Sequence, residues 1–247
     1  QQNTPFGTYL PPDSVEEVTI TPSGHHEASR MAAGAQLGLV TRSGGNQRHG
    51  AASVDLQFRS LNATNVPGGT PADRSIVRPA ASLGGPIVPD RLWYFGAYRY
   101  VRERNGLART DDELAALRFF QPGFVAYDSH LRQHQSLAKI TLQATTADQL
   151  VLSVQFDRTV TANAGLPFQT RDSAQGSRAG GPIYSATWRR LIGNRTAIDV
   201  QGGFYSKTFE SLAQGEGPSV RVYSGAVSFQ GRPFGSGPVL VEMGNVR

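Results

Sequence analysis

Apolar and polar residues alternate repeatedly from about residue 50 to the end of the chain. Between residues 150 and 157, every second residue is apolar: Leu150, Leu152, Val154 and Phe156. Successive side chains of a β-strand point to opposite faces, so this period of two predicts strands with one apolar and one polar face. The pattern predicts roughly eight strands after residue 50, which include segments 53–59, 92–101, 138–143, 150–157, 183–190, 198–205 and 220–229.

Short and long connections alternate between these segments. The short connections span residues 86–90, 145–148 and 192–195, and the long polar connections span residues 62–75, 105–132 and 161–180. An up-and-down barrel places short turns on one rim and long loops on the other. Within the second long connection, the acidic first turn of Asp111–Phe120 predicts a short helix.

The first 48 residues follow a different pattern. Val15–Ile20 and Gln36–Thr41 each predict a short strand. The stretch His25–Ala35 is rich in small residues and predicts a short helix or loop. The run Arg42–Asn46 contains two glycines and an asparagine, which signal a turn.

Alternation alone does not separate a soluble β-sandwich, whose apolar faces meet between two sheets, from a membrane barrel, whose apolar faces meet lipid. Three features favour lipid. Strands of roughly ten residues suffice to cross a bilayer at a tilt. Charges in mid-strand, at Lys139, Asp157 and Asp199, suit a wet interior better than a dry core. Aromatic residues near strand ends suggest an interfacial girdle made of Tyr94, Tyr98, Tyr100, Trp188, Tyr205 and Phe209.

Composition excludes several classes of protein. The chain has no cysteine, which excludes disulfides and thiolate metal sites. No window of about 18 apolar residues predicts a transmembrane helix, and the segment Gln1–Pro5 lacks the basic start and apolar core of a signal peptide. The net charge of +5 comes from scattered arginines rather than a basic block, so nucleic-acid binding is not expected.

No pattern of catalytic or cofactor-binding residues emerges. The histidines His25, His26 and His49 lack zinc-type spacing. His130 and His134 lie four residues apart, where a long loop enters a strand, and an extracellular loop is the favoured interpretation there. The glycine runs lack the residues of a phosphate loop, and no serine has a nucleophile-elbow context. The sequence therefore predicts no catalytic residue, metal, cofactor or enzymatic activity.

Two segments resemble TonB-dependent outer-membrane receptors of the Oar-like, carboxypeptidase-regulatory-domain group. In that family, a valine-threonine-lysine/arginine-serine-glycine-threonine-asparagine run, followed by phenylalanine-histidine-glycine, marks the end of the plug domain and the start of the barrel. Here Gly45 stands where threonine is usual and Arg48 where phenylalanine is usual. The residues that match this plug–barrel junction motif are Val40, Thr41, Arg42, Ser43, Gly44, Asn46, His49 and Gly50.

The second and more specific match covers residues 82–98 and resembles the family's second hairpin. Upstream, Ser14–Val18 resembles a strand of the family's plug, while Ala28 replaces a usual tyrosine. The resemblance spans about residues 13–103 and makes Glu27 and Arg30 candidates for contact between plug and barrel wall. The second-hairpin motif contains Gly84, Gly85, Pro86, Asp90, Phe95 and Gly96.

The resemblance implies a mostly β fold. It implies the C-terminal part of a small α/β plug domain at residues 1–48, and the N-terminal strands of an antiparallel, up-and-down transmembrane β-barrel at residues 49–247. This barrel portion would be an incomplete sheet, open or partly curled. The function implied is uptake of a scarce ligand, such as a siderophore or carbohydrate, across the outer membrane of a Gram-negative bacterium. The alternative is a soluble all-β ligand- or carbohydrate-binding module.

The partners implied are outer-membrane lipid, an unidentified imported ligand, and TonB, which would bind a segment that lies outside this chain. Family members have a barrel of roughly twenty-two strands around the plug. About eight strands would close a barrel too narrow to hold a plug, so we expect a fragment of a longer chain or a truncated gene product.

Overall fold

A computed structural model describes residues 9–21, 36–63, 73–165, 169–193 and 195–213, and the backbone of three further strands beyond residue 220. Its helical elements are η1 (Pro12–Ser14), η2 (Arg59–Leu61), α1 (Asp111–Phe120) and η3 (Arg171–Ser173). Its strands are β1 (Val15–Thr21), β2 (Gln36–Thr41), β3 (His49–Gln57), β4 (Arg74–Val88), β5 (Leu92–Gly106), β6 (Asp128–Gln143), β7 (Asp148–Ala164), β8 (Gln175–Ile192), β9 (Thr196–Ala213), β10 (Arg221–Ser224), β11 (Val227–Gln230) and β12 (Val239–Val246).

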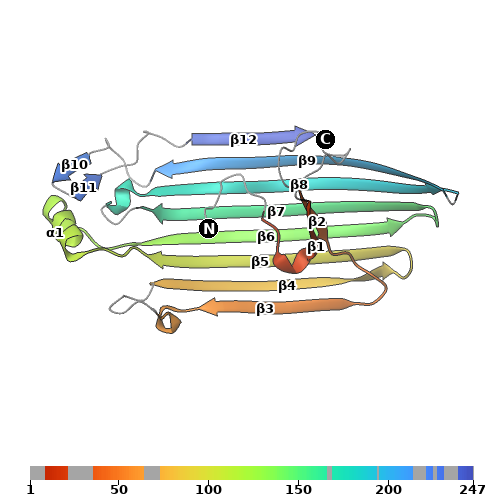
Figure 1. Ribbon diagram of the computed structural model, residues 1–247, viewed down its shortest axis with the longest axis horizontal. Helices are drawn as coiled ribbons and strands as arrows, with labels where there is room; N and C mark the ends of the chain where they lie inside the picture. The colour runs from red at the N-terminus through yellow and green to blue at the C-terminus, as the bar shows by residue number, and fades with distance from the viewer. Residues whose placement is uncertain are drawn as a thin grey trace.

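One large antiparallel sheet dominates the molecule (Figure 1). Seven strands, β3 to β9, pair in sequence order, and β12 pairs with β9 to give the order β12-β9-β8-β7-β6-β5-β4-β3. The sheet is open, since β3 and β12 form its two edges. This meander confirms the predicted mostly β, antiparallel architecture.

Tight turns join the strands at one end of the sheet, and long connections join them at the other (Figure 1). The turns link β4 to β5, β6 to β7, and β8 to β9, as the short connections predicted. Gly193 has φ +58° in the last of these turns, the positive φ expected for a hairpin turn. We refer to these two ends as the turn side and the loop side.

The helix α1 (Asp111–Phe120) lies in the loop between β5 and β6 and has the predicted bounds. Thr110 accepts a hydrogen bond from the Glu113 N–H through its side chain, while the Glu113 carboxylate accepts from the Thr110 N–H. This capping box satisfies two N-terminal amides that the helix itself leaves unpaired. No helix in the described part of the chain is long and apolar enough to cross a membrane.

The strands are longer than the alternating apolar runs predicted. The strands β4 to β9 contain 15 to 18 residues each rather than about ten. Residues 128–132, which were assigned to the long polar connection 105–132, belong to β6, and so do residues 133–137, so His130 and His134 lie in a strand rather than in a loop. The segment 220–229 was predicted as one strand, but Arg221–Ser224 and Val227–Gln230 form two separate strands, β10 and β11, which pair antiparallel with each other.

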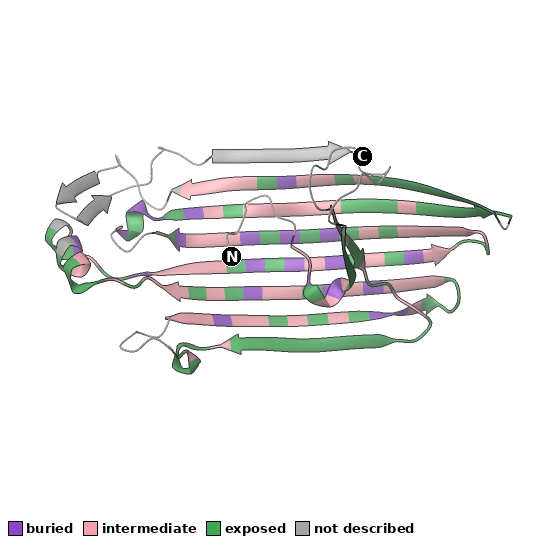
Figure 2. Cartoon of the chain, viewed as in Figure 1, coloured by how far each residue is buried: buried purple, intermediate pink, exposed green. Residues whose placement is uncertain are grey.

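The two faces of the sheet differ in chemistry. The face that bears Val54, Val154 and Ile198 is apolar over its middle, and these side chains are 57%, 40% and 39% exposed. The face that bears Phe95 and Asp157 contains most of the buried positions, which concentrate on β5 to β7 (Figure 2). We call these the outer face and the inner face, respectively. Among the described residues, no second sheet covers the outer face.

The aromatic residues of the expected girdle are divided between the two faces. The registers place Tyr94, Tyr98, Tyr100 and Trp188 on the outer face with Val154. Tyr205 and Phe209 were predicted for the same girdle, but they lie on the inner face with Lys207, because the strand period places them out of phase with exposed Phe204. The three mid-strand charges Lys139, Asp157 and Asp199 all lie on the inner face, as expected.

The N-terminal segment lies against the inner face. The strands β1 and β2 pair into a separate two-stranded antiparallel sheet, as the two short apolar runs predicted. Before it, Leu10 packs on the small apolar cluster of Phe95, Ala97 and Leu137. The Gln155 side chain donates a hydrogen bond to the Tyr9 carbonyl oxygen at 3.4 Å. The inner face is thus partly covered by the chain that precedes it.

Candidate functional site

Asn46 joins the segment after β2 to the turn between β4 and β5. Its Oδ1 accepts hydrogen bonds from the Asp90 backbone N–H at 2.8 Å and from Trp93 Nε1 at 2.7 Å. Its Nδ2 donates to the Asp90 carboxylate. Asp90 has φ 61°, a left-handed conformation that aspartate adopts more readily than most residues. Asn46 thus satisfies both the backbone and the side chain of this turn residue.

Gly44 lies directly against the backbone of β5. A Cβ atom at Gly44 would be 2.2 Å from the Tyr94 carbonyl oxygen and 2.9 Å from the Tyr94 nitrogen, so only glycine fits. A Cβ at Gly45 would meet nothing within 4 Å. Open space at Gly45 would admit the threonine that the resembled family usually carries there.

The two glycines of the hairpin motif accept the side chains that lead into β3. A Cβ at Gly84 would be 2.8 Å from His49 Nε2 and 3.1 Å from Phe95 Cδ2, while His49 and Phe95 stack at 6.4 Å between ring centroids. A Cβ at Gly85 would be 2.9 Å from Arg48 Cγ, so the arginine stem packs on that glycine. Gly84 therefore makes room for His49 of the junction motif, and Gly85 makes room for Arg48 beside it.

Lys139 holds the end of β2 against the sheet. Its Nζ donates to the Thr41 carbonyl oxygen at 2.7 Å and bonds the Ser43 Oγ at 3.2 Å. The Arg42 N–H donates to the Ser14 carbonyl oxygen at 2.8 Å, which closes the β1–β2 sheet at its base. The chain between β2 and β3 is therefore fixed to the sheet at several points.

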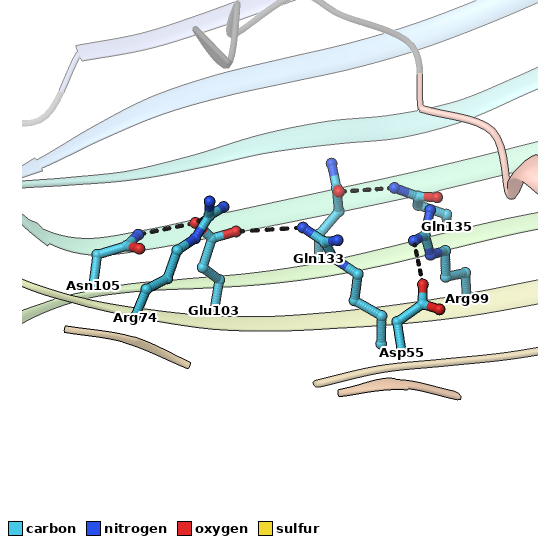
Figure 3. Close-up of polar contacts among 8 residues, drawn as sticks. Asp55, Arg74, Arg99, Glu103, Asn105, Gln133 and Gln135 are labelled. Atoms are coloured by element: carbon cyan, nitrogen blue, oxygen red, sulfur yellow. Dashed lines mark hydrogen bonds and ion pairs between the residues drawn. The ribbon is translucent and has the colours of Figure 1, made fainter. Parts of the chain in front are cut away.

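Charged side chains line the inner face on the loop side (Figure 3). Glu103 receives Arg74 Nη2 at 2.6 Å and Asn105 Nδ2 at 3.0 Å on the same oxygen, and Arg78 lies 3.9 Å from its other oxygen. These side chains come from two neighbouring strands, β4 and β5. The Glu103 carboxylate thus holds two guanidinium groups and one amide group together on the inner face of the sheet.

The network continues toward the middle of the sheet. Arg99 lies 3.4 Å from the Asp55 carboxylate. Gln135 donates to Gln133 at 2.7 Å (Figure 3). Gln133 in turn donates to the Thr159 hydroxyl at 3.0 Å. Side chains of strands β3, β5, β6 and β7 thus form a polar lining on one face.

Asp157 and Lys207 form the most buried ion pair that the structure describes. The Asp157 residue is 1% exposed, and Lys207 reaches it across β8 from β9. Burial raises the pKa of the nearby Tyr9 hydroxyl, and the negative charge of Asp157 raises it further. Tyr9 therefore stays neutral at physiological pH beside this pair.

Both motifs singled out from the sequence meet at one place in the structure. The junction residues Gly44, Asn46 and His49 contact the hairpin residues Asp90, Tyr94 and Phe95 or the glycines beside them, as given above. Sequence reasoning missed Trp93 and Lys139 as parts of this contact. Only the aromatic character of residue 93 and the mid-strand charge of residue 139 had drawn notice to them.

Other candidates fall elsewhere. Glu27 and Arg30, the candidates for contact with the barrel wall, lie outside the described residues, as do His25 and His26. The His134 ring bonds the Tyr98 hydroxyl at 2.8 Å. In the described part of the chain, no group of three or more histidine or acidic residues is placed to hold a metal ion.

The open antiparallel sheet has an apolar outer face and a charged inner face. This arrangement is typical of the wall of a membrane β-barrel. Residues 40–118 match the family model described as "Outer membrane beta barrel domain". It also has distant, partial similarity to the TonB-dependent transporter Oar of Myxococcus xanthus. The two are 31% identical over 126 residues, an alignment that covers 44% of this chain and 12% of that transporter.

The chain thus spans about an eighth of the length of the curated relative that it matches. No solved structure matches it significantly. Outer-membrane barrel and transporter families are generally non-enzymatic. The match to the barrel family begins at Val40, inside the junction motif, and includes the whole of the second hairpin.

Proposed function

We propose that this chain is part of a TonB-dependent outer-membrane receptor, and that it contains the end of the plug and the first strands of the barrel. The observation that best supports this proposal is the chemical difference between the two faces of the sheet. Its apolar face is open, while its polar face carries ion pairs and lies under the N-terminal segment. In water, an open apolar face of several strands would favour association, whereas in a bilayer it is the expected lipid contact.

The dimensions of the apolar region agree with this proposal. On β7 the outer face runs from Asp148 through Leu150, Leu152, Val154 and Phe156 to Arg158. Ten residue steps separate the two charged positions, close to the 9–11 residues that a tilted strand needs to cross the hydrocarbon. The remaining length of the strands extends on the loop side, which in such barrels faces the exterior.

The junction described above would be the fixed end of the plug. Bonds from Asn46 and Lys139 fasten residues 41–46 to the wall, so force applied nearer the N-terminus would act on β1 and β2 before it reached this attachment. In the proposed receptor, TonB would supply that force from the inner membrane through a segment outside this chain. The imported ligand would be captured by the long loops on the exterior side.

The lack of cysteine in this chain allows a direct test with single cysteines. We would introduce V154C on the outer face and S153C, its neighbour on the inner face, attach a nitroxide, and measure collision with oxygen and with a water-soluble nickel complex. In vesicles, the proposal expects oxygen contact at residue 154 and nickel contact at residue 153. Equal, nickel-dominated contact at both positions would contradict it.

The alternative is a soluble all-β ligand- or carbohydrate-binding module. It requires Leu152, Val154 and Phe156 to be buried between two sheets, yet each of them is at least 39% exposed. Cell fractionation separates the two proposals. A receptor stays with the outer membrane and needs detergent for extraction, whereas recovery as a stable monomer without detergent would favour the soluble module.

A further inference from the structure

Three arginines stand close together on the outer face, on the loop side of the apolar region. Arg102 and Arg132 are directly opposite each other on β5 and β6. Arg158 on β7 is directly opposite His134 on β6. All three arginines are exposed. We call Arg102, Arg132 and Arg158 the arginine patch.

Three acidic residues on the loop side of the sheet already have basic partners. Arg104 pairs with Asp128, Arg178 lies 3.7 Å from Glu210, and Arg59 lies 3.5 Å from Asp73. The ion pairs found among the described residues include none to the arginine patch. Like charges directly opposite each other on paired strands destabilise a sheet. In the described part of the chain, no acidic side chain forms an ion pair with the patch, so its positive charge is left for an anion from another source.

The position of the patch indicates where that anion comes from. The next outer-face residues toward the turn side are Tyr100, His134 and Phe156, and Tyr98 follows Tyr100 on β5. Tyrosines of a membrane protein gather at the level of lipid headgroups. The turn-side boundary is different, because there Arg190 lies 3.7 Å from Asp148 directly opposite it. The outer-face arginine at the turn-side boundary of β8 is thus paired with an acidic residue, whereas the arginines of the patch are not.

An apolar hollow lies further toward the turn side on the same face, on β4, β5 and β6. It measures about 570 Å³, and its outer-face lining consists of Ala81, Leu83, Tyr94, Gly96, Tyr98, Ala138 and Ile140. The hollow exists because Gly96 and Ala138 are small and flanked by larger side chains. Tyr98 borders it on the side of the arginines.

We infer that the arginine patch and this hollow together bind an anionic lipid of the loop-side leaflet. The guanidinium groups receive the phosphate groups of the headgroup, and the hollow receives part of an acyl chain. Arginine forms paired, charge-assisted hydrogen bonds with phosphate, which suits it to this role. The inference rests on the proposed membrane orientation, and it adds a specific lipid site to that orientation.

The test uses the full-length receptor, purified in a neutral detergent and titrated with diphosphoryl lipid A or with phosphatidylcholine, with bound lipid counted by native mass spectrometry. The triple variant R102Q/R132Q/R158Q should bind lipid A about 100-fold more weakly, which corresponds to about 2.8 kcal/mol. The control R91Q/R190Q/R195Q removes the same charge from the turn side and should bind like the parent protein. Phosphatidylcholine should bind weakly to all three proteins.

Three outcomes would overturn the inference. They are equal lipid A binding by the patch variant and its parent, an equal loss in the turn-side control, and complete competition by millimolar inorganic phosphate, which would indicate a free-phosphate site. The variant A138W, which fills the hollow without changing charge, should also weaken lipid A binding. If the protein were soluble without detergent, that result would contradict the proposed function itself, and not only the lipid site. A detergent-dependent protein without lipid selectivity would contradict only this inference.

Discussion

The side-chain oxygen of Asn46 accepts a hydrogen bond from the indole nitrogen of Trp93 at 2.7 Å, across 47 residues of sequence. The same oxygen receives the Asp90 N–H. This arrangement connects the segment after β2 to the first tight turn of the sheet. In the proposed receptor, these hydrogen bonds would fasten the plug to the barrel wall at the β4–β5 turn, away from the path of the ligand.

Replacing Asn46 with alanine should loosen this attachment. The change removes three hydrogen bonds and should cost about 1–3 kcal/mol of local stability. Hydrogen exchange of residues 42–48 measures it directly, and W93F, which removes one of the bonds, should have a smaller effect. The neighbouring exposed Gln47→Ala should stay within about 0.5 kcal/mol. Unchanged protection in N46A would show that the bonds do not hold the segment.

Gly44 and Gly45 offer a matched pair of alanine substitutions. G44A places a methyl group against the Tyr94 backbone and should destabilise the fold by about 3 kcal/mol. G45A has open space and should be nearly neutral. Chemical unfolding in detergent, followed by tryptophan fluorescence, compares them. A similar midpoint for both variants would argue against close contact between this segment and β5.

Lysine substitutions distinguish the two faces of β7. V154K puts a charge on the apolar outer face and should cost about 2–4 kcal/mol if this face meets lipid. S153K puts the same charge on the inner face, next to other polar groups, and should be tolerated. Unfolding midpoints in lipid vesicles give the difference. An S153K variant as unstable as V154K would contradict the proposed orientation.

The buried pair of Asp157 and Lys207 should be sensitive to the loss of one partner. K207M leaves the Asp157 carboxylate buried without a counter-charge, which should destabilise the protein by about 3–5 kcal/mol. The double variant D157N/K207M removes both charges and should recover most of this loss. Thermal unfolding followed by circular dichroism measures both. Equal loss in the single and double variants would show that packing, rather than charge, matters at this position.

The capping box of α1 permits a local test in the loop between β5 and β6. T110A removes the acceptor for the Glu113 N–H and should lower the stability of the helix by about 1 kcal/mol. T110S keeps the hydroxyl and should retain the helix. Hydrogen exchange over residues 111–120 reports the change. Because the helix lies outside the sheet, the unfolding midpoint of the barrel domain should change little in either variant.

The local pattern of the sequence determined much of this fold. Period-two alternation identified the faces of the strands, because a strand turns each successive side chain to the opposite side. Glycine, proline and asparagine marked the tight turns, and the acidic start of residues 111–120 marked the helix. These features depend on neighbours in sequence, so they can be inferred without knowing the rest of the chain.

Tertiary structure decided the strand ends and the contacts of the site. Polar residues 128–137 extend β6 because pairing with β5 and β7 supplies their backbone hydrogen bonds, which no apolar pattern records. Lys139 meets Thr41 across 98 residues, and Asn46 meets Trp93, only because the strand registers bring them together. The pairing of Asp157 with Lys207 depends likewise on the stagger of three strands. Such contacts depend on geometry accumulated over the sheet, whereas the alternating faces depend only on residues next to each other.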